Sequence, residues 1–343
     1  MYKTETATEE ELRDWNNTIS KCNYSEALHT LEWQNALTSS FKQLKPLYFA
    51  IKNSDDKIVG AMPCFAFSPF PYVTTLLSMP WSLPGGPLIL SGENSTGATL
   101  SVCNKLDEIS RRKSYYETAI TLPADYNEEI ANGLLSAGYS GQTDHFTHIL
   151  DIKKGYDYVW KSYNKRVRGA IRKADKTGVV VTESESESDM MGFYKMYLSM
   201  MQNFGSTPKP FSLLRQLQKS SIARLVVAWL DQKMIAGLLF IHFNRNVRLW
   251  CEASEPEFLS YRPNNAIIDY IIQWASNRGY SFIDFGASPP ENEGLVAFKE
   301  EWGARKASFS IFTRLYSPRR KKLWLISEPS IRRIYAAVQG FRI

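Results

Sequence analysis

The sequence has few cysteines and few histidines, and neither residue type is arranged for metal binding. Its four cysteines lie far apart and none forms a Cys-x-x-Cys pair, which favours reduced, buried thiols in a cytoplasmic protein. His145 and His148 lie close together, but the alternating residues around them predict a strand. Because a strand does not bring these two side chains together on one ion, we expect no metal site.

Long uninterrupted apolar runs are also missing. The longest uncharged stretch, Ile58 to Gly92, contains six prolines, which exclude a continuous membrane-spanning helix and favour strands joined by tight turns. The N-terminus is polar and acidic, so we expect no signal peptide. Apolar residues make up 44% of the chain and charged residues 22%, as in a soluble globular protein, and 343 residues can form one large core or two ordinary ones.

Basic residues are concentrated in two segments of a chain whose net charge is +6. Lys153–Lys176 carries nine basic residues against two aspartates, and Ser317–Ile343 carries seven against Glu328. Because the remainder is acidic, this distribution favours local anionic partners over general coating of a nucleic acid. Ser317–Ile343 alternates basic clusters with aliphatic and aromatic residues, so it can lie on an anionic membrane surface or dock on the protein as a terminal helix.

The first basic segment is predicted to contain an amphipathic helix with Trp160 and several aliphatic residues on its apolar face. Three interpretations of the basic face stay open. It can be an ordinary solvated surface, or it can pair with the acidic residues that follow. It can also bind the phosphates of a carrier or acceptor through Arg168, Arg172 and Lys173.

Two stretches share a pattern that suggests an internal duplication. Lys57–Pro63 and Lys233–Phe240 each follow an acidic turn and place small residues before an apolar strand. A similar order of predicted strands and helices follows both, although chance similarity of two short strands is the alternative. We therefore predict an α/β (α+β) chain with two copies of one unit, residues 1–145 and 146–315, and a basic amphipathic tail, residues 316–343.

The most informative stretch runs from Arg248 to Gly303. A short strand is followed by a polar loop and a helix that starts at Pro263, since proline is tolerated in the first helical turn. Apolar residues at spacings of three and four predict one buried helix face: Ile267, Ile268, Ile271, Ile272 and Ala275. A second strand follows and ends at Asp284-Phe285-Gly286. Open α/β sheets place ligands at such strand ends, beside helix N-termini.

This stretch resembles the FemAB-like branch of the GNAT acyltransferase superfamily. The matching residues are Tyr261-x-Pro263-Asn264, Arg278-Gly279-Tyr280, Asp284-Phe285-Gly286 and Phe298-Lys299-x-x-Trp302-Gly303. The resemblance implies two tandem GNAT-like domains, each a mixed, mostly antiparallel sheet flanked by helices, with the donor and catalytic cleft in the second. It also implies an acyltransferase. The best known members of the family move an amino acid from aminoacyl-tRNA to an amine of a peptidoglycan precursor, and others are acetyltransferase-like.

Acyl transfer to an amine needs a cation or N–H donor for the oxyanion, a proton acceptor, and groups that hold two substrates together. Lys299 is the candidate cation, for the oxyanion or for a donor phosphate, and the resemblance implies that Phe298 and Lys299 line the donor channel. Asp284 or Glu252 can accept the proton, although Asp284 can equally be a turn carboxylate. The candidates for holding substrates are Trp250, Tyr261 and Asn264, and Tyr261 can equally be an aromatic residue that only flanks the helix.

One departure from the family pattern concerns the donor. Acetyl-CoA-dependent GNAT enzymes carry a Gln/Arg-x-x-Gly-x-Gly/Ala loop, whose glycines let backbone N–H groups reach the pyrophosphate. Here the register reads Arg262-Pro263-Asn264-Asn265-Ala266-Ile267, which keeps the arginine and lacks both glycines. The missing glycines argue against acetyl-CoA. We expect no bound cofactor and a donor that is either aminoacyl-tRNA or acyl-CoA.

The expected reaction moves an acyl or aminoacyl group from an activated carrier to an amine of a small-molecule or lipid-linked cell-envelope precursor. The expected location is the cytoplasm, with peripheral contact at the inner face of the membrane through Ser317–Ile343. Two other functions stay open. One is an acetyl-CoA- or acyl-CoA-dependent N-acetyltransferase acting on an amino sugar or small amine. The other is a non-catalytic membrane- or RNA-binding module.

Overall fold

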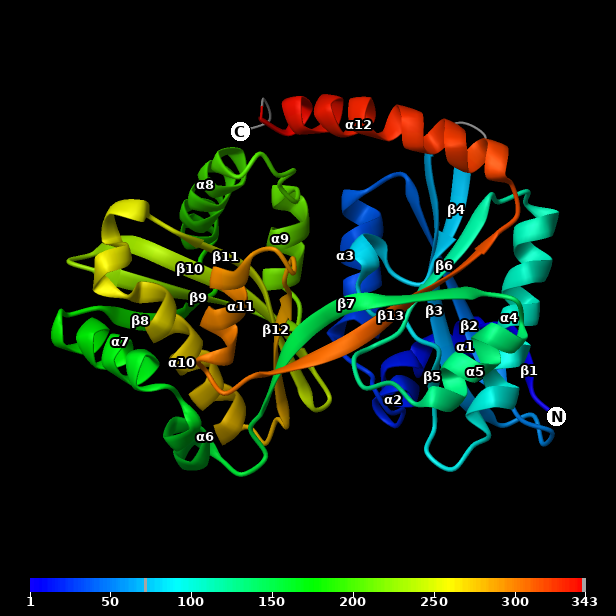
Figure 1. Ribbon diagram of the computed structural model, residues 1–343, viewed down its shortest axis with the longest axis horizontal. Helices are drawn as coiled ribbons and strands as arrows, with labels where there is room; N and C mark the ends of the chain where they lie inside the picture. The colour runs from blue at the N-terminus through cyan, green and yellow to red at the C-terminus, as the bar shows by residue number, and fades with distance from the viewer. Residues whose placement is uncertain (71–72, 341–343) are drawn as a thin grey trace. The chain divides into compact units, whose positions relative to one another are not determined.

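The computed structural model describes residues 1–70 and 73–340, which divide into two compact units (Figure 1). Unit 1 contains Met1–His145 and Ser308–Arg333, and unit 2 contains Phe146–Ala307 and the chain from Ile334. This division differs from the predicted one, in which residues 308–315 belong to the second domain and the tail stands alone. Residues 71, 72 and 341–343, which fall in stretches predicted as strands and tail, lie outside the described residues.

Three elements have residues in both units. They are strand β7 (Ser140–Asp151), strand β13 (Arg305–Leu315) and helix α12 (Pro318–Gly340). Strand β13 contributes Ile311–Leu315 to the sheet of unit 1, where they pair with residues 117–121. Strand β7 contributes its second half to the sheet of unit 2. Each sheet is therefore completed by a strand that has residues in both units.

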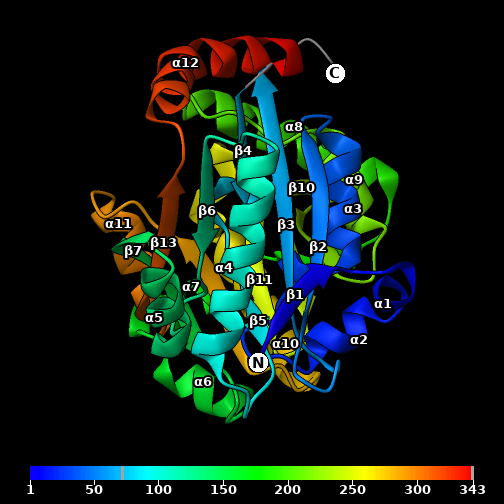
Figure 2. The ribbon, with the colours of Figure 1, turned by 90° about the vertical axis from the view of Figure 1, so that its right-hand side faces the viewer.

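Unit 1 is a mixed β-sheet with helices packed against it (Figure 2). Its other elements are β1 (Lys3–Thr6), α1 (Glu9–Arg13), α2 (Trp15–Ser20), η1 (Ala27–His29), α3 (Leu31–Ser40), β2 (Leu44–Lys52), β3 (Ile58–Phe70), β4 (Val73–Leu77), η2 (Pro80–Ser82), β5 (Leu88–Ile89), α4 (Ser95–Arg112), β6 (Glu117–Thr121) and α5 (Glu128–Ser136). Strands β1 to β4 pair as antiparallel neighbours, β4 pairs with β6 in parallel, and β6 pairs with β13 antiparallel.

Helix α4 forms because its sequence has one apolar face and a side-chain cap. Asn94 caps its N-terminus by accepting a hydrogen bond from the Gly97 N–H at 2.9 Å. Ala98, Val102 and Leu106 are buried at spacings of four against β1, β2, β6 and α5. All four cysteines of the chain are free and buried, as predicted.

Unit 2 repeats this order of strand pairings. Its other elements are α6 (Tyr156–Ser162), α7 (Lys165–Lys176), β8 (Val180–Ser184), α8 (Glu187–Asn203), α9 (Phe211–Gln218), β9 (Ala223–Leu230), β10 (Lys233–Phe243), β11 (Asn246–Ser254), η3 (Pro256–Tyr261), α10 (Pro263–Asn277), β12 (Phe282–Ala287) and α11 (Glu293–Glu300). Strands β8 to β11 are antiparallel neighbours, β11 pairs with β12 in parallel, and β12 pairs with β7 antiparallel. Both sheets are mixed and mostly antiparallel, as predicted.

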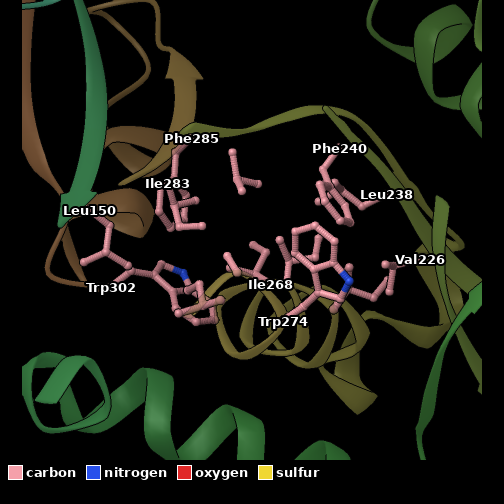
Figure 3. Close-up of a cluster of buried hydrophobic side chains, with 14 of the residues drawn as sticks. Leu150, Val226, Leu238, Phe240, Ile268, Trp274, Ile283, Phe285 and Trp302 are labelled. Atoms are coloured by element: carbon pink, nitrogen blue, oxygen red, sulfur yellow. The ribbon is translucent and has the colours of Figure 1, made fainter. Parts of the chain in front are cut away.

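The core of unit 2 lies between the sheet and α10 (Figure 3). Leu238 and Phe240 point from β10 toward this helix, and the Phe240 ring packs edge-on against Trp274 with centroids 4.9 Å apart. The alternate residue Gly237 faces α8, where a Cβ atom would approach the Phe193 ring to 2.7 Å. Alternation along one strand therefore places α10 and α8 on opposite faces of the sheet.

Candidate active site

The parallel pairing between β11 and β12 is short. It joins Asn246–Arg248 to Phe282–Asp284, although β11 runs on to Ser254 alongside β10. Strand β11 also bulges at Trp250, because Leu249 and Cys251 oppose consecutive residues of β10. A bulge leaves a residue outside the ladder and is common beside active sites. Across the part of the chain that the structure describes, β11 and β12 share no pairing after Arg248 and Asp284.

Helix α10 begins after this bulge and has an uncapped N-terminus. Arg262 precedes the helix with a left-handed backbone (φ 64°), Pro263 opens it, and no side chain of the described residues caps its first N–H groups. Asn264 donates a weak hydrogen bond of 3.4 Å to the Ser254 hydroxyl at the end of β11. Free N–H groups and the helix dipole make this end suited to an anionic ligand.

Lys299 is buried, with 6% of its surface exposed, and it points at the C-terminal end of β12. Its Nζ donates to the carbonyls of Gly286 at 2.7 Å and Ala287 at 3.2 Å. Burial lowers the pKa of Lys299 to about 8, and the charges of Asp284 and Glu252 oppose this shift. An ammonium group has three N–H donors, so one remains for a substrate.

Glu252 is the free carboxylate of the site. The residue as a whole is exposed, and its carboxylate makes no hydrogen bond or ion pair with any residue that the structure describes. The surrounding protein still limits its hydration, which raises its pKa, and the Lys299 charge lowers it. A carboxylate that is accessible, unpaired and close to a lysine suits the acceptance of a proton.

Asp284 differs from Glu252 because its oxygens are already occupied. It accepts hydrogen bonds from the Thr147 hydroxyl and from the Gly286 N–H at 2.7 Å, and it forms an ion pair with Arg248 at 2.9 Å. The Arg248 and Asp284 side chains are only 9% and 13% exposed. These contacts join β7, β11 and β12 and favour the alternative interpretation, in which Asp284 is a turn carboxylate that shapes the site.

The buried Arg248–Asp284 pair leads to a stability prediction. Replacing Arg248 with Met leaves a buried carboxylate without its cation, and we expect the free energy of unfolding to fall by about 3 kcal/mol. Arg245→Met, an exposed charge in the turn before β11, is the matched control and should change it by about 0.5 kcal/mol or less. Urea unfolding of the two variants measures both values. Equal changes in the free energy of unfolding for the two variants would show that the Arg248–Asp284 pair contributes nothing to stability.

The Lys299 pKa predicts a pH dependence of stability. The folded chain loses the Lys299 proton near pH 8, whereas the unfolded chain keeps it up to about the ordinary value of 10.5. Between these values the unfolded state binds more protons, so this residue makes the free energy of unfolding rise with pH. We therefore expect the free energy of unfolding of the wild type, relative to that of Lys299→Met, to rise between about pH 8 and pH 10.5. A difference that is constant from pH 7 to 10.5 would contradict the shifted pKa.

The remaining predicted binding residues lie around the same strand end or pack beneath it. Trp250 is half-buried under the Lys209 ammonium, which lies 5.4 Å from its ring. Tyr261 packs on Phe258 with ring centroids 5.9 Å apart. Phe298 turns inward and packs edge-on against the fully buried Trp302, with centroids 6.2 Å apart. Phe298 therefore supports α11 through the core while Lys299 reaches the strand end.

Of the three predicted phosphate-binding residues on the basic helix α7, Arg168 and Arg172 contact other residues. Arg168 donates to backbone carbonyls at the end of α6, including Tyr163 at 2.5 Å, and so caps that helix. Arg172 lies over the Trp160 ring at 5.8 Å. Lys173 is exposed. The contacts of Arg168 favour a structural role over the predicted binding of phosphate.

His148 is a residue of this site that sequence reasoning set aside. It is fully buried in β7, and neither ring nitrogen has a hydrogen-bond partner among the described residues. Burial, together with the Lys299 charge, lowers its pKa, which keeps the ring neutral. The histidine pair was considered only for metal binding, and no group of residues suited to a metal ion occurs in ranges 1–70 and 73–340.

Comparisons with known proteins bear on the family and the fold of the chain. Residues 161–300 match the family described as Acetyltransferase (GNAT) domain. The UDP-N-acetylmuramoylpentapeptide-lysine N(6)-alanyltransferase of Weissella viridescens is 24% identical over 158 residues, which cover 44% of this chain and 47% of that protein. The crystal structure of FemX has a TM-score of 0.77 at 15% identity and covers 94% of this chain and 99% of its own. A tandem GNAT protein from the clavulanic acid biosynthesis pathway has a TM-score of 0.57 at 12% identity, with 93% and 99% covered.

The match to the curated relative spans about half of that protein's length. The two solved structures, at their low identities, establish the fold, which is a tandem GNAT fold as predicted. Residues 161–300 match the GNAT domain family, and the predicted resemblance to the FemAB-like branch of the GNAT superfamily is confirmed.

Proposed function

We propose that this protein is an acyltransferase that moves an acyl or aminoacyl group from an activated carrier to an amine of a cell-envelope precursor. The observation that carries the proposal is the nearness of buried Lys299 and the unpaired carboxylate of Glu252 at a strand end where the β11–β12 ladder stops, since the charge of each acts on the other. Both groups have shifted pKa values, which is typical of catalytic sites. The similarity to an alanyltransferase that acts on a peptidoglycan precursor supports the class of acceptor.

The proposed step uses the two groups differently. The acceptor amine attacks the acyl carbonyl and a new C–N bond forms. The remaining N–H of Lys299 stabilises the oxyanion, while Glu252 takes the proton that the amine loses. The C–O bond of an aminoacyl ester or the C–S bond of a thioester then breaks, and the proton passes from Glu252 to the leaving group. The bonds formed and broken and the proton transferred balance without a metal ion.

Aminoacyl-tRNA is the proposed donor. The start of α10 has Asn265 and Ile267 in place of the two glycines whose backbone N–H groups reach the pyrophosphate in acetyl-CoA-dependent GNAT enzymes. A second candidate donor, acyl-CoA, is favoured by a specific observation: the β11–β12 ladder ends after Arg248 and Asp284. Strands that part in this way provide a place for a thioester arm between them.

A transfer assay with both donors tests the proposal. The protein is incubated with labelled alanyl-tRNA or acetyl-CoA and with a UDP-linked muramoyl pentapeptide that carries lysine. We expect the label to move from alanyl-tRNA to the lysine amine. Transfer from acetyl-CoA alone would select the second candidate. Absence of transfer from either donor, with no thermal shift in the presence of either, would contradict both.

The structure contains no helix, in the residues it describes, that is long and apolar enough to cross a membrane. We propose a cytoplasmic protein with peripheral membrane contact through α12. The inner face of this helix docks on unit 1, where Trp324 packs against Phe67 and Lys321 pairs with Glu117. Its outer face leaves three aliphatic side chains and two basic ones in solvent: Leu323, Leu325, Ile326, Arg319 and Lys322. This mixture suits an anionic lipid surface.

Ile326→Glu tests the membrane contact. The change places a negative charge on the exposed face and removes apolar area, so we expect binding to vesicles of phosphatidylcholine and phosphatidylglycerol to weaken at least about tenfold. Leu135→Glu, at an exposed leucine of α5, is the control for the same chemical change elsewhere. Co-sedimentation measures both. If the two variants bind vesicles equally, α12 is not the contact.

A further inference from the structure

A pocket of about 510 Å³ opens in unit 1 where α4, β13 and α12 meet. It is lined by three arginines, Arg111, Arg314 and Arg320, and by hydroxyl groups that include Ser114 and Ser317. The volume lies in the range of pockets that hold small ligands. All residues that line the pocket belong to unit 1, whereas Lys299 and Glu252 belong to unit 2, so a ligand of this pocket is independent of the proposed transfer reaction.

The positive charge in this pocket is only partly neutralised by the protein. Arg314 pairs with Asp107 at 3.0 Å and donates to the Ala137 carbonyl. Arg111 lies over the Tyr316 ring at 5.8 Å, and Arg320 donates to the Ser114 carbonyl. Neither Arg111 nor Arg320 pairs with a carboxylate within residues 1–70 and 73–340. Two guanidinium groups therefore share one concave site without a counter-ion from the protein.

The N-terminus of α12 adds to the positive electrostatic potential of the pocket. Ser317 lines the pocket and its carbonyl accepts the first hydrogen bond of the helix, from the Lys321 N–H at 3.1 Å. The N–H groups of the first turn have no partner within the helix, and a 23-residue helix carries partial positive charge at this end. Guanidinium groups, hydroxyls and a helix N-terminus are the donors that proteins use to bind phosphate.

We propose that this pocket binds a phosphate group. The arginines supply charge and planar donors, and the serine hydroxyls supply further hydrogen bonds. A structural alternative exists for Arg111, because a cation in the last turn of α4 is favoured by the helix dipole. Arg112 occupies the same last turn but pairs with Glu108 at 3.8 Å and does not line the pocket. Comparing variants of Arg111 and Arg112 therefore separates phosphate binding from a favourable interaction with the helix dipole.

Two sources can supply the phosphate. The exposed aliphatic residues Leu323, Leu325 and Ile326 follow the pocket along α12, which suits the headgroup of an anionic phospholipid. A soluble phosphate-bearing molecule offers the same chemistry. The experiment has one arm for each source. Isothermal titration of the full chain with inorganic phosphate measures the soluble arm. Co-sedimentation with phosphatidylcholine vesicles, with and without phosphatidylglycerol, measures the lipid arm.

We expect Arg111→Gln to weaken phosphate binding about tenfold, as the loss of a hydrogen bond to a charged group does, and Arg112→Gln to leave it within about twofold. If vesicle binding depends on Arg111 in the same way, the ligand is a lipid headgroup. If only phosphate binding does, the ligand is soluble, and both results support the site. Equal effects of the two variants, or no binding by the wild-type chain in either arm, would overturn the proposal.

Discussion

Lys299→Met is expected to lower kcat for acyl transfer by about 100- to 1,000-fold, which is the effect of removing one donor to an oxyanion. Methionine keeps the unbranched apolar stem of lysine, but it is one heavy atom shorter and has no N–H. The loss should appear in kcat more than in KM, because the remaining N–H acts on charge that develops in the transition state. Single-turnover transfer to the labelled precursor measures the change.

A control is needed to separate a catalytic role of Lys299 from a structural one, because Lys299 also donates hydrogen bonds to the Gly286 and Ala287 carbonyls. Lys306→Met removes an exposed lysine that pairs with Glu300 at 3.3 Å in the same unit, and it should leave kcat within about twofold. Added methylammonium should partly restore activity to Lys299→Ala. A variant that melts earlier but transfers at the wild-type rate would show that Lys299 is only structural.

Glu252→Gln is expected to lower kcat by about 100-fold, because the amide cannot accept the proton from the attacking amine. The wild-type rate should fall as the pH falls through the pKa of Glu252, which lies above its ordinary value of 4.5. The variant should lack this acid limb. A rate profile from pH 4 to 8 tests the sign of the effect.

Glu257→Gln is the matched control for Glu252. This carboxylate lies on η3, a few residues further along the chain, and pairs with Lys233 at 3.1 Å on the surface. Its replacement should change the rate less than twofold. If Glu252→Gln keeps the acid limb while Asp284→Asn loses it, then Asp284 is the base despite its three partners.

Much of unit 2 could be predicted from local sequence. The apolar spacing from Ile267 to Ala275 defines the face of α10 that is buried in the core. The charges of Asp284 and Glu252 both act on Lys299, so the three predicted catalytic residues lie near one another. The prediction of α10 succeeds because helix periodicity is encoded within about 15 residues, whereas the roles of the three site residues stay predictions.

The parts that could not be predicted depend on distant pairing. Thr147 reaches Asp284 across 137 residues of sequence, so the occupied state of that carboxylate has no local signal. Arg168 shows the same limit, because its capping of α6 depends on where that helix ends. The place of residues 308–315 in unit 1 rests on pairs such as Ile311 with Thr121. The position of Arg248 between Val247 and Leu249 is a local sign of a buried charge that the sequence analysis did not use.

The central claim is that the donor carbonyl binds at the end of β12 against Lys299. A crystal structure of the chain with a non-hydrolysable aminoacyl ester analogue tests this most directly. We expect the carbonyl oxygen of the analogue about 3 Å from the Lys299 Nζ, with its anionic portion at the first turn of α10. An analogue whose carbonyl lies in unit 1, or beyond hydrogen-bond distance from Lys299, would contradict the account.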